Sequence, residues 1–213
     1  MKRFTNYLIG LVNSMGYLFY RFPLLYDFML KIVHRGNLEK RYKIISKEIG
    51  KNKKVLDIGC GTCLILEYMD DSSQYIGFEL NKRFRNYALK KYREKKKNLK
   101  VMSSDFFNFR KYPIVDIILV CDVLHHIYPR HKELLSYAIK KSKKTIVCEP
   151  RGERMGFVYP DFDGINLSTQ DRGPNGWKRE FFYKKDLINF FKSMGAKKIK
   201  IIGNDVIATF IRP

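Results

Sequence analysis

A short apolar segment, Val55–Ile58, runs directly into a turn with two closely spaced glycines, Gly59 and Gly61. Glycine lets the backbone turn sharply and lets a ligand approach closely, because it has no Cβ. In parallel α/β sheets, ligands bind outside the carboxyl ends of the strands, where such turns lie. The segment therefore predicts a strand that ends in a ligand-binding turn.

Strand-like and helix-like segments alternate along the rest of the chain. Helices are predicted over residues 4–20, 24–34, 37–50, 64–69, 81–97, 131–141 and 184–195, and strands over residues 53–59, 73–80, 98–106, 115–123, 144–150, 197–203 and 205–213. Alternation of this kind predicts an α/β fold with a parallel sheet and right-handed crossovers. The last two strands are joined too tightly for a crossover, so we expect an antiparallel last strand in a seven-stranded, mostly parallel sheet.

The charge balance constrains the partners. Forty-two Lys and Arg residues against 21 Asp and Glu residues give a formal net charge of +21. This excess favours an anionic partner: nucleic acid, anionic lipid or a phosphorylated substrate. The alternative is that the lysines only keep the protein soluble. Four cysteines without regular spacing do not indicate a secreted disulfide scaffold, so we expect a cytoplasmic protein.

Residues 1–50 are predicted to form a helical lid or substrate-binding segment ahead of a domain over residues 51–213. The uncharged run between Arg3 and Arg21 is interrupted by polar residues and lacks an obvious cleavage site. A signal peptide or a membrane span is therefore the lesser alternative. We expect an apolar helix that packs on the domain, with peripheral membrane contact through residues 4–34.

Cys60 and Cys63 form a C-x-x-C pattern, which would suit a redox pair or half a zinc site. A structural zinc site needs four ligands, and Cys121 with His125 or His126 would have to complete it. Such a site would compete with the glycine turn for the same space. We interpret the pattern as coincidental and predict no metal.

Polar residues at later strand ends suggest what the turn binds. Leu64 stands where a dinucleotide fingerprint has a third glycine, which disfavours NAD and FAD. Asp57 would repel a pyrophosphate and attract a cation. Glu79 can accept two hydrogen bonds from ribose hydroxyls, while Asp105 and Phe106 can offer an acceptor and an apolar face to adenine.

The segments VLDIGCGT, YIGFEL, SSDFFNF and DIILVCDVLHHI, in this order and spacing, resemble the motifs of class I S-adenosylmethionine-dependent methyltransferases. The resemblance covers roughly residues 50–150 and implies a Rossmann-like fold, S-adenosyl-L-methionine as cofactor, and methyl transfer. The segments LLYDFML, DVLHHI and FFYKKDLINFFKSMGAKKIK also resemble the ubiquinone/menaquinone-biosynthesis type.

The resemblance implies the following cofactor-binding residues: Asp57, Gly59, Cys60, Gly61, Glu79, Leu80, Asp105, Phe106 and Cys121. Asp57 would lie near the amino group of the cofactor and Glu79 would hold the ribose. The alternatives are that Asp57 bonds loop amides, that Asp105 caps a turn, and that Cys121 is a buried filler. Cys63 stands where the family has glycine, and its side chain could crowd the turn.

The residues after the fourth strand bear on the methyl acceptor. They read CDVLHH, without the N/D-P-P-Y/F pattern of adenine methylation, and Cys121 does not follow a proline as a cytosine-attacking thiol would. His125 and His126 are the candidates for proton transfer, and Tyr26 is a third candidate catalytic residue, placed on the N-terminal segment. Aromatic residues within 157–183 could help to enclose a hydrophobic substrate.

The sequence therefore predicts a methyltransferase acting on a small-molecule or lipid-like acceptor. RNA is the alternative acceptor because of the charge, and the run Lys82–Lys100 is dense in basic residues. A cofactor-binding protein without catalysis and a membrane-surface binding module are the alternatives from other classes. The oligomeric state is not predicted.

Overall fold

The computed structural model describes residues 21–34, 36–127, 129–150 and 184–212. The predicted helix over residues 4–20 and the aromatic residues within 157–183 lie outside these ranges. None of the helices among the described residues is both long and apolar enough to span a bilayer.

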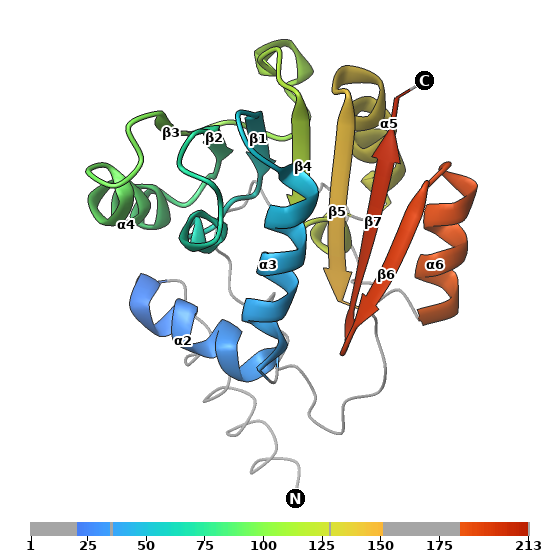
Figure 1. Ribbon diagram of the computed structural model, residues 1–213, viewed down its shortest axis with the longest axis horizontal. Helices are drawn as coiled ribbons and strands as arrows, with labels where there is room; N and C mark the ends of the chain where they lie inside the picture. Colours follow the sequence, from blue (N-terminus) through green and yellow to red (C-terminus); the bar gives the residue numbers. More distant parts are fainter. Residues whose placement is uncertain (1–20, 35, 128, 151–183, 213) are drawn as a thin grey trace, which may run out of the picture.

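A seven-stranded sheet forms the centre of the protein, in the order β3-β2-β1-β4-β5-β7-β6 (Figure 1). The strands are β1 (Lys54–Ile58), β2 (Gln74–Phe78), β3 (Leu99–Met102), β4 (Ile117–Cys121), β5 (Lys144–Pro150), β6 (Lys198–Ile202) and β7 (Asp205–Ile211). Strands β1 to β5 pair in parallel, and β7 is antiparallel to both β5 and β6. The predicted α/β class and the antiparallel last strand are confirmed.

The helices are α2 (Pro23–Val33), α3 (Asn37–Ile49), α4 (Lys82–Tyr92), α5 (His131–Lys141) and α6 (Lys184–Ser193). Asn81 caps α4, because its side chain accepts hydrogen bonds from the first backbone amides of the helix. The helix predicted over residues 64–69 is instead a single 3₁₀ turn, Leu64–Glu67. The segment is too short to repay the nucleation of an α-helix, so the tighter turn suffices.

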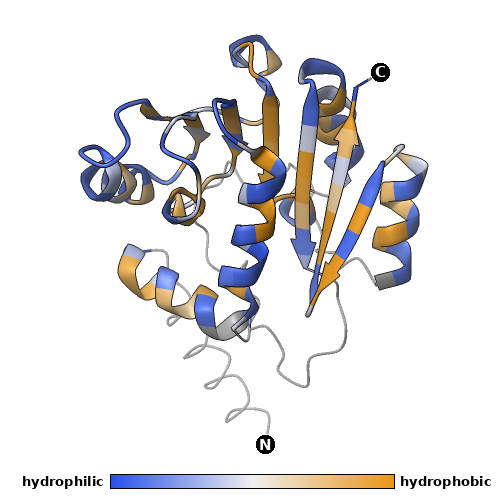
Figure 2. Cartoon of the chain, viewed as in Figure 1, coloured by the Kyte–Doolittle hydropathy of each residue, from blue (hydrophilic) through white to orange (hydrophobic). Residues whose placement is uncertain are grey.

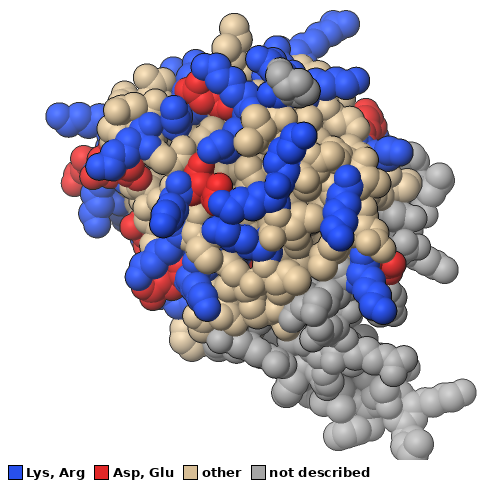
Figure 3. All heavy atoms as spheres, turned by 45° about the vertical axis from the view of Figure 1, so that its right-hand side comes forward, with Lys and Arg blue, Asp and Glu red and all other residues tan. Residues whose placement is uncertain are grey.

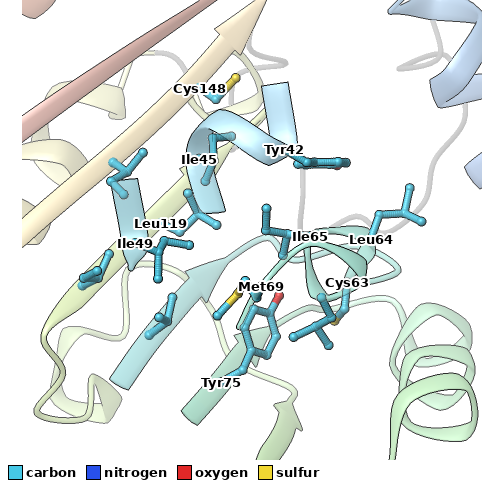
Figure 4. Packing of buried hydrophobic residues seen from close by; sticks show 14 of the residues in the cluster. Tyr42, Ile45, Ile49, Cys63, Leu64, Ile65, Met69, Tyr75, Leu119 and Cys148 are labelled. Atoms are coloured by element: carbon cyan, nitrogen blue, oxygen red, sulfur yellow. The ribbon is translucent and has the colours of Figure 1, made fainter. Parts of the chain in front are cut away.

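Both faces of the sheet are covered, which explains why β4 is apolar throughout. Helix α3 covers one face, where its residues Tyr42, Ile45 and Ile49 pack with Leu119 (Figure 4). Helices α5 and α6 contribute to a second core on the other face, which contains Leu56, Ile118, Leu134 and Phe191 among others. In Figure 2 the central strands are mostly hydrophobic, whereas α3 and α4 carry hydrophilic residues along their length.

Helix α2 lies at the end of the molecule toward which the arrows of β4 and β5 point (Figure 1). This is the carboxyl edge of the parallel strands, where α/β proteins bind ligands. The predicted division of the chain after residue 50 stays a prediction; α3, which ends just before it, shares its buried face with the sheet.

Candidate functional site

The turn after β1 needs glycine for two different reasons. Gly59 has a φ of 69°, and a Cβ there would lie 2.6 Å from Cγ2 of Val123. Gly61 has a φ of 54°, but its nearest neighbour, the Tyr26 ring, would be 3.8 Å from a Cβ. The backbone amides of Gly59 and Cys60 both donate to the carbonyl of Phe78, at 2.8 and 3.1 Å. Glycine is thus required at position 59 because a side chain would clash with Val123. At position 61 it is required by the positive φ, and the lack of a side chain leaves the backbone there accessible to a ligand.

A cavity lies beside this turn, between the ends of β1 and β4 and the inner side of α2. Its lining residues are Tyr26, Leu30, Tyr42, Asp57, Gly59, Cys60, Gly61, Thr62, Leu64, Ile65, Leu119, Cys121 and Asp122. The structure therefore brings together six of the predicted site residues: Tyr26, Asp57, Gly59, Cys60, Gly61 and Cys121.

Asp57 is a buried carboxylate in the wall of this cavity. Its Oδ2 accepts a hydrogen bond of 2.5 Å from the Tyr75 hydroxyl, so its partner is not a loop amide. Its Oδ1 is buried and has no hydrogen-bond partner among the described residues. Burial, assisted by the nearby Glu79 and Asp122 carboxylates, raises the pKa of Asp57 to about 7. A buried carboxylate oxygen of this kind suits a ligand that brings a positively charged donor.

Glu79 ties the glycine turn to the end of β2. Its Oε2 accepts a hydrogen bond from the amide of Gly61 at 2.9 Å, and its Oε1 accepts one from the amide of Asn81 at 2.7 Å. Glu79 does not line the cavity itself. The predicted hydrogen bonds from Glu79 to a ribose stay a prediction. Its hydrogen bond with the Gly61 amide gives it a further role, which is to hold the glycine turn.

Leu80, Asp105 and Phe106 do not line the cavity either. Leu80 is half-buried, and its carbonyl accepts a hydrogen bond from Arg85. Asp105 is exposed, and its side chain accepts a hydrogen bond from the amide of Phe107 at 2.9 Å, as a turn cap would. The Phe106 ring borders the turn, 3.5 Å from the position of a Cβ at Gly59. The predicted adenine contacts of these residues remain predictions.

The two cysteines of the C-x-x-C pattern are free and have different surroundings. Cys63 has a φ of 59°, a conformation that favours glycine, yet its side chain is fully buried in the core near Tyr75 (Figure 4). The Cys60 sulfur packs against Gly77. Cys63 therefore fills the core behind the turn and does not crowd its open side.

Of the candidate catalytic histidines, His125 is held by a buried carboxylate. Nδ1 of His125 lies 2.7 Å from Oε2 of Glu149, which ends β5 and is fully buried. The other oxygen of Glu149 accepts hydrogen bonds from the amides of Val123 and Leu124, both at 2.7 Å. His126 is exposed, and its ring lies 4.0 Å from that of His125 between centroids. Neither histidine lines the cavity.

Glu149 was not among the predicted site residues. A signal was present, because a carboxylate that follows the apolar residues Ile146, Val147 and Cys148 in a buried strand needs a partner. Its geometry fixes the orientation of His125, which is the arrangement expected of a histidine that accepts a proton.

A buried ionic cluster beside the cavity was also missed. Arg41 is completely buried; its guanidinium contacts Asp122 at 2.5 and 3.1 Å and Asp205 at 3.5 Å. Nδ1 of His34 lies 3.2 Å from Asp205. Asp122 has a φ of 55° and lines the cavity. Burial opposes its charge, but Arg41 holds the pKa of Asp122 below its usual value.

Oxygen and nitrogen atoms of His34, Asp122 and Asp205 lie within 4.8 Å of one another, close enough to hold a metal ion. However, the Arg41 guanidinium already contacts both carboxylates. It supplies the positive charge that a metal would bring, and would repel one. The cluster is therefore best described as an ion-pair network.

Helix α2 is attached over the glycine turn. The Tyr26 ring packs on Phe84 with 4.7 Å between centroids. Asp27 is buried and accepts hydrogen bonds from Thr62 Oγ1 at 2.5 Å and from the Tyr87 hydroxyl at 3.3 Å. Burial raises the pKa of Asp27 despite these bonds. Tyr26 is thus held at the cavity by its neighbours on the turn and on α4.

Several solved structures with the same fold are methyltransferases. Magnesium protoporphyrin IX methyltransferase from Synechocystis, with bound S-adenosylhomocysteine, matches 98% of this chain and 100% of that chain, with a TM-score of 0.64 and 14% identity. A methyltransferase from Aquifex aeolicus, described as S-adenosylmethionine-dependent, matches 80% of this chain and 89% of that chain, with a TM-score of 0.54 and 17% identity. An O-methyltransferase family protein from Burkholderia thailandensis matches 84% of this chain, with a TM-score of 0.59 and 13% identity; the chain spans 58% of its length.

The protein therefore has the fold of the class I S-adenosylmethionine-dependent methyltransferases. A family model described as a methyltransferase domain matches residues 56–144, from β1 to the start of β5, so the chain carries a methyltransferase domain. This confirms the predicted class of enzyme. The finer resemblance to the ubiquinone/menaquinone-biosynthesis type stays a prediction. No curated protein matches the chain by sequence.

Proposed function

We propose that this protein transfers a methyl group from S-adenosylmethionine to a small-molecule or lipid-like acceptor. One observation carries the first half of the proposal: an open glycine turn and a buried, unpartnered oxygen of Asp57 line the same cavity. S-adenosylmethionine carries a sulfonium and an ammonium group, so the carboxylate and the cofactor match in charge. When bound, this cofactor supplies a methyl group that is already activated for in-line displacement.

The residues of the chain would then bind, orient and handle protons. Asp57 would accept a hydrogen bond from the ammonium group, and the backbone at Gly61 would let the methionine portion approach. Glu79 would hold the ribose while keeping the turn in place through the Gly61 amide. Tyr26 would cover the turn from α2. Because the methyl donor is activated, alignment of the two reactants is the main task left to the protein.

His125 is the residue best arranged to accept a proton from the acceptor. Glu149 binds Nδ1 and so directs Nε2, the other ring nitrogen, as the position that exchanges a proton. His126 and Tyr26 remain the other candidates for a catalytic role.

Calorimetric titration with S-adenosylmethionine tests cofactor binding. Glu79→Ala is expected to weaken binding by about 1–3 kcal/mol, because it removes a ribose acceptor and the anchor of the Gly61 amide. Glu133→Ala is the matched control, since Glu133 is exposed on α5 and, within the described part of the chain, forms an ion pair with Arg130. Absence of binding by the wild-type protein at millimolar cofactor would refute the proposal.

Cofactor affinity is also expected to depend on pH. Burial keeps Asp57 protonated below about pH 7, and a cationic ligand needs the ionised form. Affinity should therefore be full above pH 7 and fall by up to about tenfold for each pH unit below it. Asp57→Asn should bind weakly at all pH values and lose this dependence. An unchanged slope in the variant would show that another group causes it.

The proposed class of acceptor rests on two observations, the absence of a nucleobase-methylation motif and the name of one structurally similar enzyme. The nucleobase-methylation pattern is absent after β4. The methyltransferase from Synechocystis is named for a small molecule, magnesium protoporphyrin IX. We propose that the protein is cytoplasmic and contacts a membrane peripherally through residues 4–34. This contact would give the site access to a lipid-like acceptor in the membrane.

RNA is the second candidate acceptor, favoured by the net charge of +21. Figure 3 shows Lys and Arg side chains spread over the visible face without gathering in one stripe, which fits a solvated surface as well as an RNA-binding one. If RNA is the partner, its affinity should fall steeply with rising salt. A weak, salt-independent affinity would remove this alternative.

A further inference from the structure

The two sides of α2 have opposite surroundings. Tyr26 and Leu30 line the cavity and Asp27 is buried against the glycine turn. The opposite side is exposed and apolar: Leu24 is 72% and Phe28 57% exposed. Such exposure on a helix that packs over the cavity calls for an explanation, because large contiguous apolar patches on soluble proteins usually mark contact sites.

Helix geometry places the exposed residues together. At 100° per residue, Leu24, Leu25 and Phe28 share one side of α2, and Phe22 directly precedes the helix. We call these four residues the α2 face. They are half of the eight large hydrophobic residues that are exposed among the described parts of the chain; the others, Met102, Ile114, Ile201 and Ile211, are scattered.

Cations border the α2 face at both ends. Arg21 is exposed and lies just ahead of the helix beside the Phe22 ring, and Lys31 is exposed and falls next to Leu24 on the helix at 100° per residue. The first turn of α2 carries no acidic residue. An apolar helical face bounded by basic residues is typical of helices that lie in the interface of an anionic membrane, with the cations at the headgroups.

We propose that the α2 face docks on the surface of an anionic lipid bilayer. The net charge of +21 complements such a surface. The same charge opposes pairing of two copies through this face, since Arg21 and Lys31 of each copy would approach those of the other. Docking through α2 would set the cavity, which lies behind the same helix, close to the bilayer. This last step rests on the proposed methyl transfer at the cavity, and the docking deepens the membrane contact proposed above by assigning it to the α2 face.

Vesicle co-sedimentation of the full chain tests the proposal. The probes are phosphatidylcholine vesicles with and without phosphatidylserine. The wild-type protein should sediment with the phosphatidylserine vesicles and less with phosphatidylcholine alone. Leu24→Ser/Phe28→Ser should lower the partition coefficient by about tenfold or more, because two inserted side chains are lost. Ile114→Ser is the control: Ile114 is 84% exposed but lies away from α2, so its loss should change nothing.

Four outcomes would overturn the proposal. In the first, the wild-type protein fails to bind anionic vesicles. In the second, the double variant binds them as well as the wild type does. Alternatively, sedimentation velocity shows a dimer that the double variant abolishes, which would make the α2 face an interface between copies. A lowered melting temperature of the double variant would show that another part of the chain covers the face. Calorimetry with S-adenosylmethionine separates this question from the proposed function, since the double variant should bind the cofactor normally.

Discussion

Arg41→Met is expected to lower the free energy of unfolding by about 3–5 kcal/mol. Arg41 is fully buried and neutralises Asp122, which directly follows β4, and Asp205, which begins β7. Methionine fills a similar volume but leaves two carboxylates without their charge partner. Removing one member of a buried ion pair costs far more than the pair contributes, because the remaining charge stays desolvated. Urea unfolding followed by circular dichroism measures the change.

The control is Arg130→Met, which removes an exposed pair with Glu133 on one helix turn. Its cost should be about 0–1 kcal/mol. Adding Asp122→Asn and Asp205→Asn to Arg41→Met should recover part of the loss, since the unpaired charges are then absent. Equal costs for Arg41→Met and Arg130→Met would mean that the cluster is open to water and that its burial is not as described.

His125→Asn is expected to lower the rate of methyl transfer by about 10²–10⁴-fold while leaving the affinity for S-adenosylmethionine unchanged. His125 is oriented by Glu149, and asparagine cannot accept a proton at neutral pH. The rate is measured with labelled cofactor and a cell extract, and mass spectrometry identifies the labelled product. The same experiment reveals the acceptor and distinguishes RNA from small molecules and lipids.

His126→Asn is the matched control, because His126 adjoins His125 but is exposed. Its rate should stay close to that of the wild type. A Glu149→Gln variant should also lower the rate, since Glu149 orients the His125 ring and is a positioning residue. If His126→Asn is the slow variant, or if neither variant is slow, His125 is not the proton acceptor.

The sequence pattern was sufficient to predict the fold because that prediction depends on local signals. Each strand end was marked by a polar residue or by glycine, and the short link between β6 and β7 dictated their antiparallel pairing. The cavity residues Asp57, Gly59 and Gly61 were predicted for the same reason. The helix predicted over residues 64–69 was wrong, since the structure has only a 3₁₀ turn at Leu64–Glu67. A mostly apolar segment of six residues does not reveal how far a helix extends.

The ionic cluster could not be predicted in this way, because its members are far apart in sequence. Arg41 lies 81 residues from Asp122 and 164 from Asp205. In the structure, Arg41 shares the buried side of α3 with Leu38 and Ile45. Nothing in that pattern indicates which carboxylates would meet it, since this depends on the order of strands in the sheet.

That strand order has a consequence for how the protein is made. Asp205 belongs to β7, which inserts between β5 and β6 and brings its side chain to Arg41 and His34. During synthesis from the amino terminus, Arg41 and Asp122 emerge from the ribosome long before Asp205. Until β7 has been synthesised and inserted, the cluster beside the cavity lacks one of its two carboxylates, and β5 lacks its neighbour on the side away from β4. The wall of the site that depends on this cluster can therefore be completed only after the end of the chain has been made.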